Sequence, residues 1–213
     1  MKVLIADDEP VARQVLREHV EAIPTLEVAG EASTGKETLQ RILDLDPDVV
    51  LLDQQMPELD GLAVDALHML AFVDTEPADQ LKWGQQALAI AQASSQPAAK
   101  KWEASLRNNI GYALYQLGRY EEALDQFKQA VVLREKGEDV QATRIAHWMV
   151  GWTLRALNRT DEALEIQLRL EREREAAGAP SPYVFEELEL LYRTKGDRER
   201  ADHYAGLKKA TAQ

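Results

Sequence analysis

The chain has 213 residues, of which 45% are hydrophobic and 29% are charged, a composition typical of a soluble globular protein with room for one or two domains. It contains no cysteine, which excludes disulfides and thiolate metal sites and leads us to expect a cytoplasmic protein. Its formal net charge is −12, and no apolar run is long enough for a membrane span, so we expect no membrane segment.

The negative charge is concentrated in the first third of the chain. Residues 1–66 contain 15 Asp and Glu against 5 Lys and Arg, whereas residues 67–213 contain 22 against 20. Neither part has the basic surplus that binding to a phosphate backbone requires. We therefore expect no nucleic-acid partner.

The first third alternates between apolar strands and amphipathic helices. The pattern predicts strands at 2–6, 26–32 and 48–52, and helices at 9–21 and 35–43. This βαβαβ alternation argues for a parallel sheet with right-handed crossovers, and the continuous apolarity of the strands indicates that helices cover both faces. In the first helix we expect four apolar side chains to face inward, namely Val11, Val15, Leu16 and Val20.

Acidic residues follow the first and third strands directly. The run VLIADDEP ends in Asp7 and Asp8, and the run VVLLDQQMPELDG delivers Asp53 to a loop. If two parallel strands end side by side, the three carboxylates share one cleft. Magnesium prefers such a site, where a few carboxylate oxygens are combined with waters and a phosphate.

These two segments resemble the start of a bacterial response-regulator receiver domain, and the resemblance covers residues 1–66. It implies the strand order 2-1-3, with the site at the carboxyl ends of the strands. It also implies that Asp53 is the phosphoacceptor. Magnesium would be held by Asp7, Asp8, Asp53 and the backbone carbonyl of Gln55.

The second half of a receiver domain has no counterpart in the sequence. After Gly61 the family continues with a strand ending in Thr or Ser and another followed by Lys-Pro. No apolar β-type run occurs between residues 70 and 213, and no Lys-Pro dipeptide occurs at all. We therefore expect weak magnesium binding without the conformational response that normally reports phosphorylation.

From about residue 62 onward the chain is helical in pattern and repeats itself. Residues 109–131 align without gaps with 149–171, a period of 40, and residues 189–207 form a third copy 38 residues further on. Small residues recur at equivalent positions, which lets paired helices approach closely. The pattern resembles a tetratricopeptide (TPR) array and predicts a helical-hairpin solenoid over 62–213.

One helix, at about 62–72, matches both resemblances. It stands where the third receiver helix belongs, and it would also open a first hairpin with residues 77–94. The fold class is therefore α/β plus all-α, a partial receiver over 1–66 fused through a shared helix to the solenoid. Such a join resembles an engineered or recombined chimera, and a naturally decayed receiver is the alternative.

The resemblance to TPR arrays implies a concave groove that binds a protein or peptide. The candidate groove residues are Asn108, Tyr112, Tyr115, Trp148, Trp152 and Arg155. The plainer reading is that Trp148 and Trp152, four residues apart, are inter-repeat core. A carboxylate clamp is disfavoured because Ile145 and Met149 occupy the positions where basic residues are expected.

Two functions from different classes follow. The first is a structural and protein-interaction scaffold without catalytic activity. The second is a signalling protein in which Asp53 still accepts a phosphoryl group in a magnesium-dependent phosphorelay. We also expect a homodimer, because strand 48–52 would lie at a sheet edge where a fourth strand is missing, and edges of this kind are seldom left open.

Overall fold

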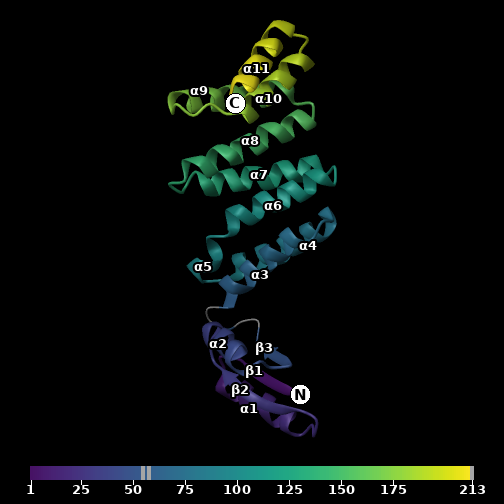
Figure 1. Cartoon of the computed structure of the whole chain (residues 1–213), viewed down its shortest axis with the longest axis vertical. Helices are drawn as coiled ribbons and strands as arrows, with labels where there is room; N and C mark the ends of the chain where they lie inside the picture. The colour runs from purple at the N-terminus through teal and green to yellow at the C-terminus, as the bar shows by residue number, and fades with distance from the viewer. Residues whose placement is uncertain (54–55, 57–58, 212–213) are drawn as a thin grey trace. The chain divides into compact units, whose positions relative to one another are not determined.

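The computed structural model describes residues 1–53, 56 and 59–211. By contacts the chain divides into two compact units, one formed by residues 1–70 with 86–102 and the other by residues 71–85 with 103–213. Figure 1 shows the sheet and its two helices near the N-terminus, followed by a succession of helices. No helix in the described part of the chain is both long and apolar enough to cross a membrane.

The predicted three-stranded parallel sheet is confirmed. Its strands lie in the order β2-β1-β3, and β1 pairs in parallel with both neighbours. The elements are β1 (Lys2–Ala6), α1 (Pro10–Glu21), β2 (Glu27–Ala32), α2 (Gly35–Leu45) and β3 (Val49–Leu52).

The alternation of side chains along β1 builds two small cores, one on each face of the sheet. Val3 and Ile5 pack with Val20 of α1 on one face, whereas Ala6 packs with Ala32 and Met56 in a separate cluster. Because successive side chains of a strand point to opposite faces, an uninterrupted apolar strand buries every residue only when both faces are covered. The central position of β1 follows from this pattern.

The prediction that four apolar residues of α1 face inward was only partly right. Val20 is buried and Leu16 packs against the same cluster, but Val11 is 75% exposed and Val15 is 46% exposed. Successive helical residues are rotated by about 100°, so the stripe through Leu16 and Val20 that faces the sheet turns Val11 and Val15 away from it. Both valines are left at the surface of this unit.

From Leu59 to Thr211 every described element is helical. The predicted helix at 62–72 lies within one continuous helix, α3 (Leu59–Val73). The others are α4 (Pro77–Ala93), α5 (Pro97–Lys100), α6 (Glu103–Gln116), α7 (Tyr120–Arg134), α8 (Val140–Ala156), α9 (Thr160–Ala176), α10 (Pro182–Thr194) and α11 (Arg198–Thr211).

The helices from α6 onward form three hairpins with the same turn. Gly118, Asn158 and Gly196 follow the first helix of each pair and all have positive φ, 74°, 59° and 78°. After each of them a backbone N–H donates to a carbonyl five residues earlier, as in Arg119 N to Leu114 O at 2.9 Å and Arg159 N to Leu154 O at 2.9 Å. The left-handed residue ends the helix, so the predicted period of 40 is a repeat of backbone geometry.

Small residues let the paired helices approach, as the sequence predicted. Ala123, Ala163 and Ala201 are fully buried. At Gly111 an added Cβ would lie 2.7 Å from the ring of Phe127. A larger side chain at this position would have to displace the Phe127 ring.

Candidate functional site

The acidic cluster is built by the ends of two neighbouring parallel strands. Asp7 follows β1, and its N–H donates to Ala32 O at 3.1 Å. Asp53 follows β3, and its N–H donates to Ala6 O at 2.8 Å. These ladder bonds continue the sheet by one residue on each side and bring the two aspartates to the same edge.

The three predicted carboxylates do come together. One carboxylate oxygen from each of Asp7, Asp8 and Asp53 lies within 4.8 Å of the others. Asp7 is buried, Asp53 is half-buried and Asp8 is exposed, so the cluster opens to solvent on one side. Gln55, the fourth predicted ligand, lies outside the described residues.

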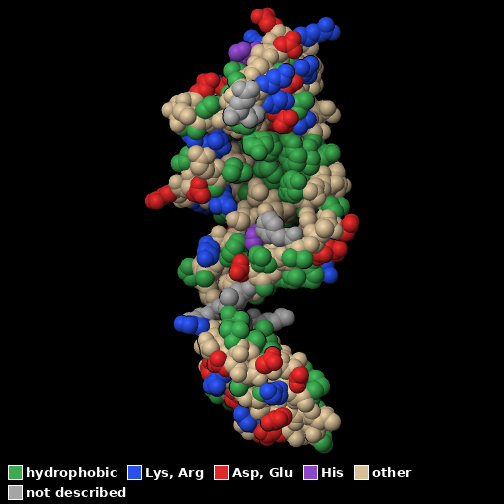
Figure 2. All heavy atoms as spheres, in the orientation of Figure 1, with side chains coloured by type: hydrophobic (Ala, Val, Ile, Leu, Met, Phe, Trp, Pro, Cys, Tyr) green, Lys and Arg blue, Asp and Glu red, His purple; other side chains and the backbone are tan. Residues whose placement is uncertain are grey.

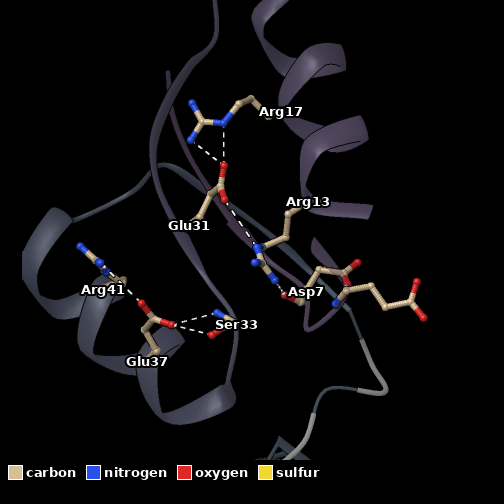
Figure 3. Close-up of polar contacts among 8 residues, drawn as sticks. Asp7, Arg13, Arg17, Glu31, Ser33, Glu37 and Arg41 are labelled. Atoms are coloured by element: carbon tan, nitrogen blue, oxygen red, sulfur yellow. Dashed lines mark hydrogen bonds and ion pairs between the residues drawn. The ribbon is translucent and has the colours of Figure 1, made fainter. Parts of the chain in front are cut away.

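Asp7 is oriented by contacts that the sequence reasoning missed. Its Oδ1 accepts the Glu9 N–H at 2.8 Å, and its backbone carbonyl accepts Arg13 Nη1 at 2.8 Å. Arg13 also pairs with Glu31 of β2, with Nε 3.5 Å from Oε2, and Arg17 donates to the same glutamate at 2.6 Å. Figure 3 shows these contacts running from Arg17 through Glu31 and Arg13 to Asp7. The available signal was the pair of arginines four residues apart on α1.

The donor set fits magnesium. Hard divalent cations take carboxylate oxygens, and this cluster offers three of them around one opening. When bound, magnesium would neutralise part of the negative charge that the three carboxylates bring together. The protein itself contributes the fixed position of Asp7, through Glu9 and Arg13, and the strand end that presents Asp53.

A second candidate site is the aromatic stack, formed by Tyr112 and Tyr115 of α6 with Trp148 and Trp152 of α8. The rings of Tyr115 and Trp152 are stacked at a centroid distance of 3.5 Å, and Trp148 and Trp152 at 5.7 Å. Tyr112 stacks on Trp152 at 6.2 Å. Asn108, the first predicted groove residue, lies half-buried one turn before Tyr112.

The predicted groove residue Arg155 is held by a buried carboxylate. Its Nε and Nη2 donate to the two carboxylate oxygens of Glu187 at 2.7 and 2.8 Å, and Glu187 is only 3% exposed. Such a planar, bidentate pair is geometrically specific, and it ties α8 to α10. Burial is the main cause that raises the pKa of the neighbouring Tyr115 hydroxyl above its ordinary value.

The aromatic stack extends beyond the predicted residues to Tyr183 of α10. The Trp148 Nε1–H donates to Tyr183 O at 3.3 Å, and the two rings meet edge to face at 6.4 Å. Sequence reasoning missed Tyr183 and Glu187 because the third copy was aligned only over residues 189–207, which begin after both of them. Figure 2 shows hydrophobic side chains gathered in a broad patch at the level of α8.

The comparisons with known proteins agree with this division. Residues 3–70 match the family model of the response regulator receiver domain, and residues 102–172 match that of the tetratricopeptide repeat. The chain therefore joins a receiver-type α/β segment to TPR repeats, a combination of signalling and protein-interaction parts.

The matches to curated relatives are about as long as the receiver-type segment. The uncharacterized transcriptional regulatory protein YhcZ of Bacillus subtilis is 44% identical over 75 residues, which is 35% of this chain and 35% of that protein. A protein-glutamate methylesterase/protein-glutamine glutaminase of Carboxydothermus hydrogenoformans is 43% identical over 70 residues, 33% of this chain and 20% of that enzyme. The chain thus spans about a third or less of the length of these relatives, so their activities do not transfer with the match.

Solved structures of repeat proteins resemble the chain in fold. BtubC (BKLC) from P. vanneervenii has a TM-score of 0.64 at 18% identity, covering 83% of this chain and 70% of that one. A protein of nearly identical TPR-like repeats from Podosopora anserina has a TM-score of 0.59 at 17% identity, covering 70% of this chain and 74% of that one. At such low identity these likenesses support the fold alone.

Proposed function

We propose that the chain is a protein-interaction scaffold whose helical repeats bind a protein or peptide segment over the aromatic stack. It has no catalytic activity of its own and acts in the cytoplasm, as the cysteine-free sequence leads us to expect. Its architecture is that of a recombined or engineered chimera. In this proposal the receiver-type segment is a folded appendage that retains its acidic cluster.

The continuous stack of Tyr112, Tyr115, Trp152 and Trp148 is the observation that carries this proposal. Its outermost ring, Tyr112, is 45% exposed, and Tyr183 at the other end is 67% exposed. Large aromatic rings lose little conformational entropy on binding and dominate interface energetics, especially when a scaffold already orients them. The Arg155–Glu187 pair supplies that rigidity by fixing α8 against α10.

Peptide selection tests the scaffold. A random peptide library is panned on the full chain, and the affinities of enriched peptides are measured by calorimetry. Tyr112→Ala removes only a half-exposed ring, and we expect it to weaken binding at least tenfold. Tyr120→Ala is the control, since Tyr120 touches the stack only through the edge of Tyr115, at 4.9 Å. Equal affinity of the wild type and Tyr112→Ala for every selected peptide would contradict the proposal.

Phosphotransfer is the second candidate function, and the geometry of the acidic cluster favours it. Asp53 stands at a strand end beside two further carboxylates that could hold magnesium. Acetyl phosphate with magnesium would then add one phosphoryl group to Asp53, detected by intact mass and absent in Asp53→Asn. The missing hydroxyl and Lys-Pro segments lead us to expect no accompanying change in structure.

We further propose a homodimer through β3. Among the described residues β3 pairs with β1 on one side only, and Leu52 at its end is 48% exposed. An antiparallel pairing of β3 with its two-fold mate would satisfy the free edge in an isologous interface and make a six-stranded sheet.

A further inference from the structure

A cavity of about 260 Å³ lies between α8, α9 and α10. Its walls are mainly apolar and include Ile145 and Met149 of α8, Leu170 of α9 and Val184 of α10. We call this cavity the apolar seat. Met149, Leu170 and Val184 are buried, whereas Ile145 is 51% exposed and stands where the seat meets solvent.

The size of the seat suits one bulky side chain. An apolar cavity of about 150 Å³ is enough to hold benzene, so this one has room for a phenyl ring or a branched aliphatic group. The scaffold around it is rigid because Leu170 and Val184 belong to the buried core shared by α9, α10 and α11. The seat is therefore preformed, which lowers the entropic cost of binding.

Two arginines line the same seat. Arg174 is half-buried, and no described carboxylate forms an ion pair with it. Arg144 donates from Nη2 to the backbone carbonyl of Glu173 at 3.2 Å. Its buried Nε makes no hydrogen bond within the described part of the chain, but it lies 3.7 Å from Glu173 Oε2 in an ion pair. Of the two, Arg174 is the one without an ion pair in the described part of the chain, so it is the cation that this pocket offers to an anion, in a chain whose net charge is −12.

The apolar seat adjoins the aromatic stack through Trp148. The Trp148 ring stacks on Trp152 and also lines the seat, as does Tyr183. A segment lying over the stack would therefore reach the seat without leaving the surface.

We propose that the apolar seat binds a partner protein segment in which a bulky apolar side chain is followed by acidic residues. The side chain fills the space between α8, α9 and α10, and a neighbouring carboxylate pairs with Arg174, while Arg144 stays paired with Glu173. This inference rests on the proposed function of the repeats and adds the chemistry of the ligand.

Three labelled peptides in a Gly-Ser background test the inference by fluorescence anisotropy at physiological salt. One carries Phe-Glu-Glu, the second Ser-Glu-Glu and the third Phe-Lys-Lys. We expect the first to bind at least tenfold more tightly than either of the others. A preference for Glu over Lys would run against the net charge of the chain and so would report the local site. Equal affinities, or no binding of the first peptide, overturn the inference.

Two variants assign the binding to the seat. Ile145→Trp obstructs the opening, and Arg174→Glu reverses its charge. We expect each to weaken Phe-Glu-Glu binding at least tenfold, and Arg174→Glu to shift the preference toward Phe-Lys-Lys. The matched controls are Val132→Trp, at a site on α7 that is 53% exposed, and Arg172→Glu, an exposed neighbour on α9. Both controls should leave the affinity unchanged.

Different experimental outcomes would contradict the proposed function and this inference. If Tyr112→Ala weakens selected peptides while Ile145→Trp and Arg174→Glu do not, the scaffold stands and the seat is not its binding site. If the seat variants weaken Phe-Glu-Glu while Tyr112→Ala changes nothing, the seat binds without the aromatic stack, and the proposed role of the stack is wrong.

Discussion

Gln167 packs directly on Gly151, so that a Cβ added to the glycine would lie 2.7 Å from Gln167 Nε2. In the preceding repeat the same two positions hold Phe127 and Gly111. Gln167 is fully buried, and neither its Nε2 nor its Oε1 has a hydrogen-bond partner in the described part of the chain. The second repeat thus contains a desolvated amide where the first has an aromatic ring.

Replacing that amide should stabilise the protein. Burying a polar group without a partner costs about 1–3 kcal/mol, and Met has nearly the shape of Gln. We expect Gln167→Met to raise the free energy of unfolding by about 1–2 kcal/mol, measured by urea denaturation. The exposed Gln141 on α8 provides the control, and Gln141→Met should change little. A loss of stability in Gln167→Met would mean that the amide has a partner.

Glycine-to-alanine substitutions at two helical positions should change the stability of the protein in opposite directions. At Gly111 a Cβ would meet three ring carbons of Phe127 at 2.7–2.9 Å, whereas at Gly206 it would meet nothing within 4 Å. Overpacking costs about 1–3 kcal/mol, and relief of glycine entropy in a helix gains about 0.5–1 kcal/mol. In thermal unfolding, the midpoint temperature of Gly111→Ala should therefore be lower than that of the wild type, and the midpoint temperature of Gly206→Ala should be higher.

The start of α2 should make stability depend on pH. Thr34 caps the helix by accepting the Glu37 N–H at 3.2 Å, and Glu37 in return accepts from the N–H and hydroxyl of Ser33 at 2.9 and 3.1 Å (Figure 3). These Ser33 bonds are the main cause that lowers the pKa of Glu37 below its ordinary value. Because the pKa of Glu37 is lowered in the folded state, its carboxylate stabilises the fold at pH values above the ordinary carboxyl range. This stabilisation is lost as the pH falls through the folded-state pKa.

Glu37→Gln tests this dependence. We expect the variant to be less stable than the wild type at neutral pH and the difference to shrink as the pH falls below about 4. Denaturation across a pH series measures it, with the exposed Glu18→Gln as a control on α1. A difference that is independent of pH would show that the charge of Glu37 contributes nothing.

Magnesium should stabilise the receiver-type segment. Three carboxylates within 4.8 Å repel one another, so a cation that binds only the folded state adds stability, about 1.4 kcal/mol at ten times its dissociation constant. Asp53→Asn should reduce this gain and should itself stabilise the metal-free protein. Calorimetric unfolding with magnesium and with EDTA measures both effects. The same magnesium response in Asp53→Asn and in the wild type would place the ion elsewhere.

Light scattering should detect the dimer and locate it on β3. The Asp53 N–H points to β1, and because N–H groups alternate in direction along a strand, the Val50 N–H faces the free edge. Val50→Pro therefore removes a donor from the proposed interface while leaving the β1 ladder intact. We expect about twice the monomer mass of 23.9 kDa for the wild type and the monomer mass for Val50→Pro. Leu43→Lys, at a side chain on α2 that is 80% exposed, should remain dimeric, and a monomeric wild type would defeat the proposal.

The sequence by itself determined the elements, their order and the acidic cluster. Apolar runs ending in Asp7 and Asp53 predicted both the parallel strands and their shared edge, because the pairing of parallel strands leaves little freedom in where their ends lie. The period of 40 predicted the helical hairpins, and the structure then showed that Gly118 and Asn158, which the repeat aligns, both have positive φ. Both results depend on local chemistry, which a sequence displays directly.

Only the tertiary structure decided which side chains meet across elements. The exposure of Val11, the bond from Arg13 to the Asp7 carbonyl and the burial of Glu187 under Arg155 depend on how helices rotate about their axes and pack. An identical pattern of residue types would permit several such rotations. The choice among them is made by the close packing of the whole core, because each helix settles where its neighbours leave space, and that information is spread over the chain rather than held in any one motif.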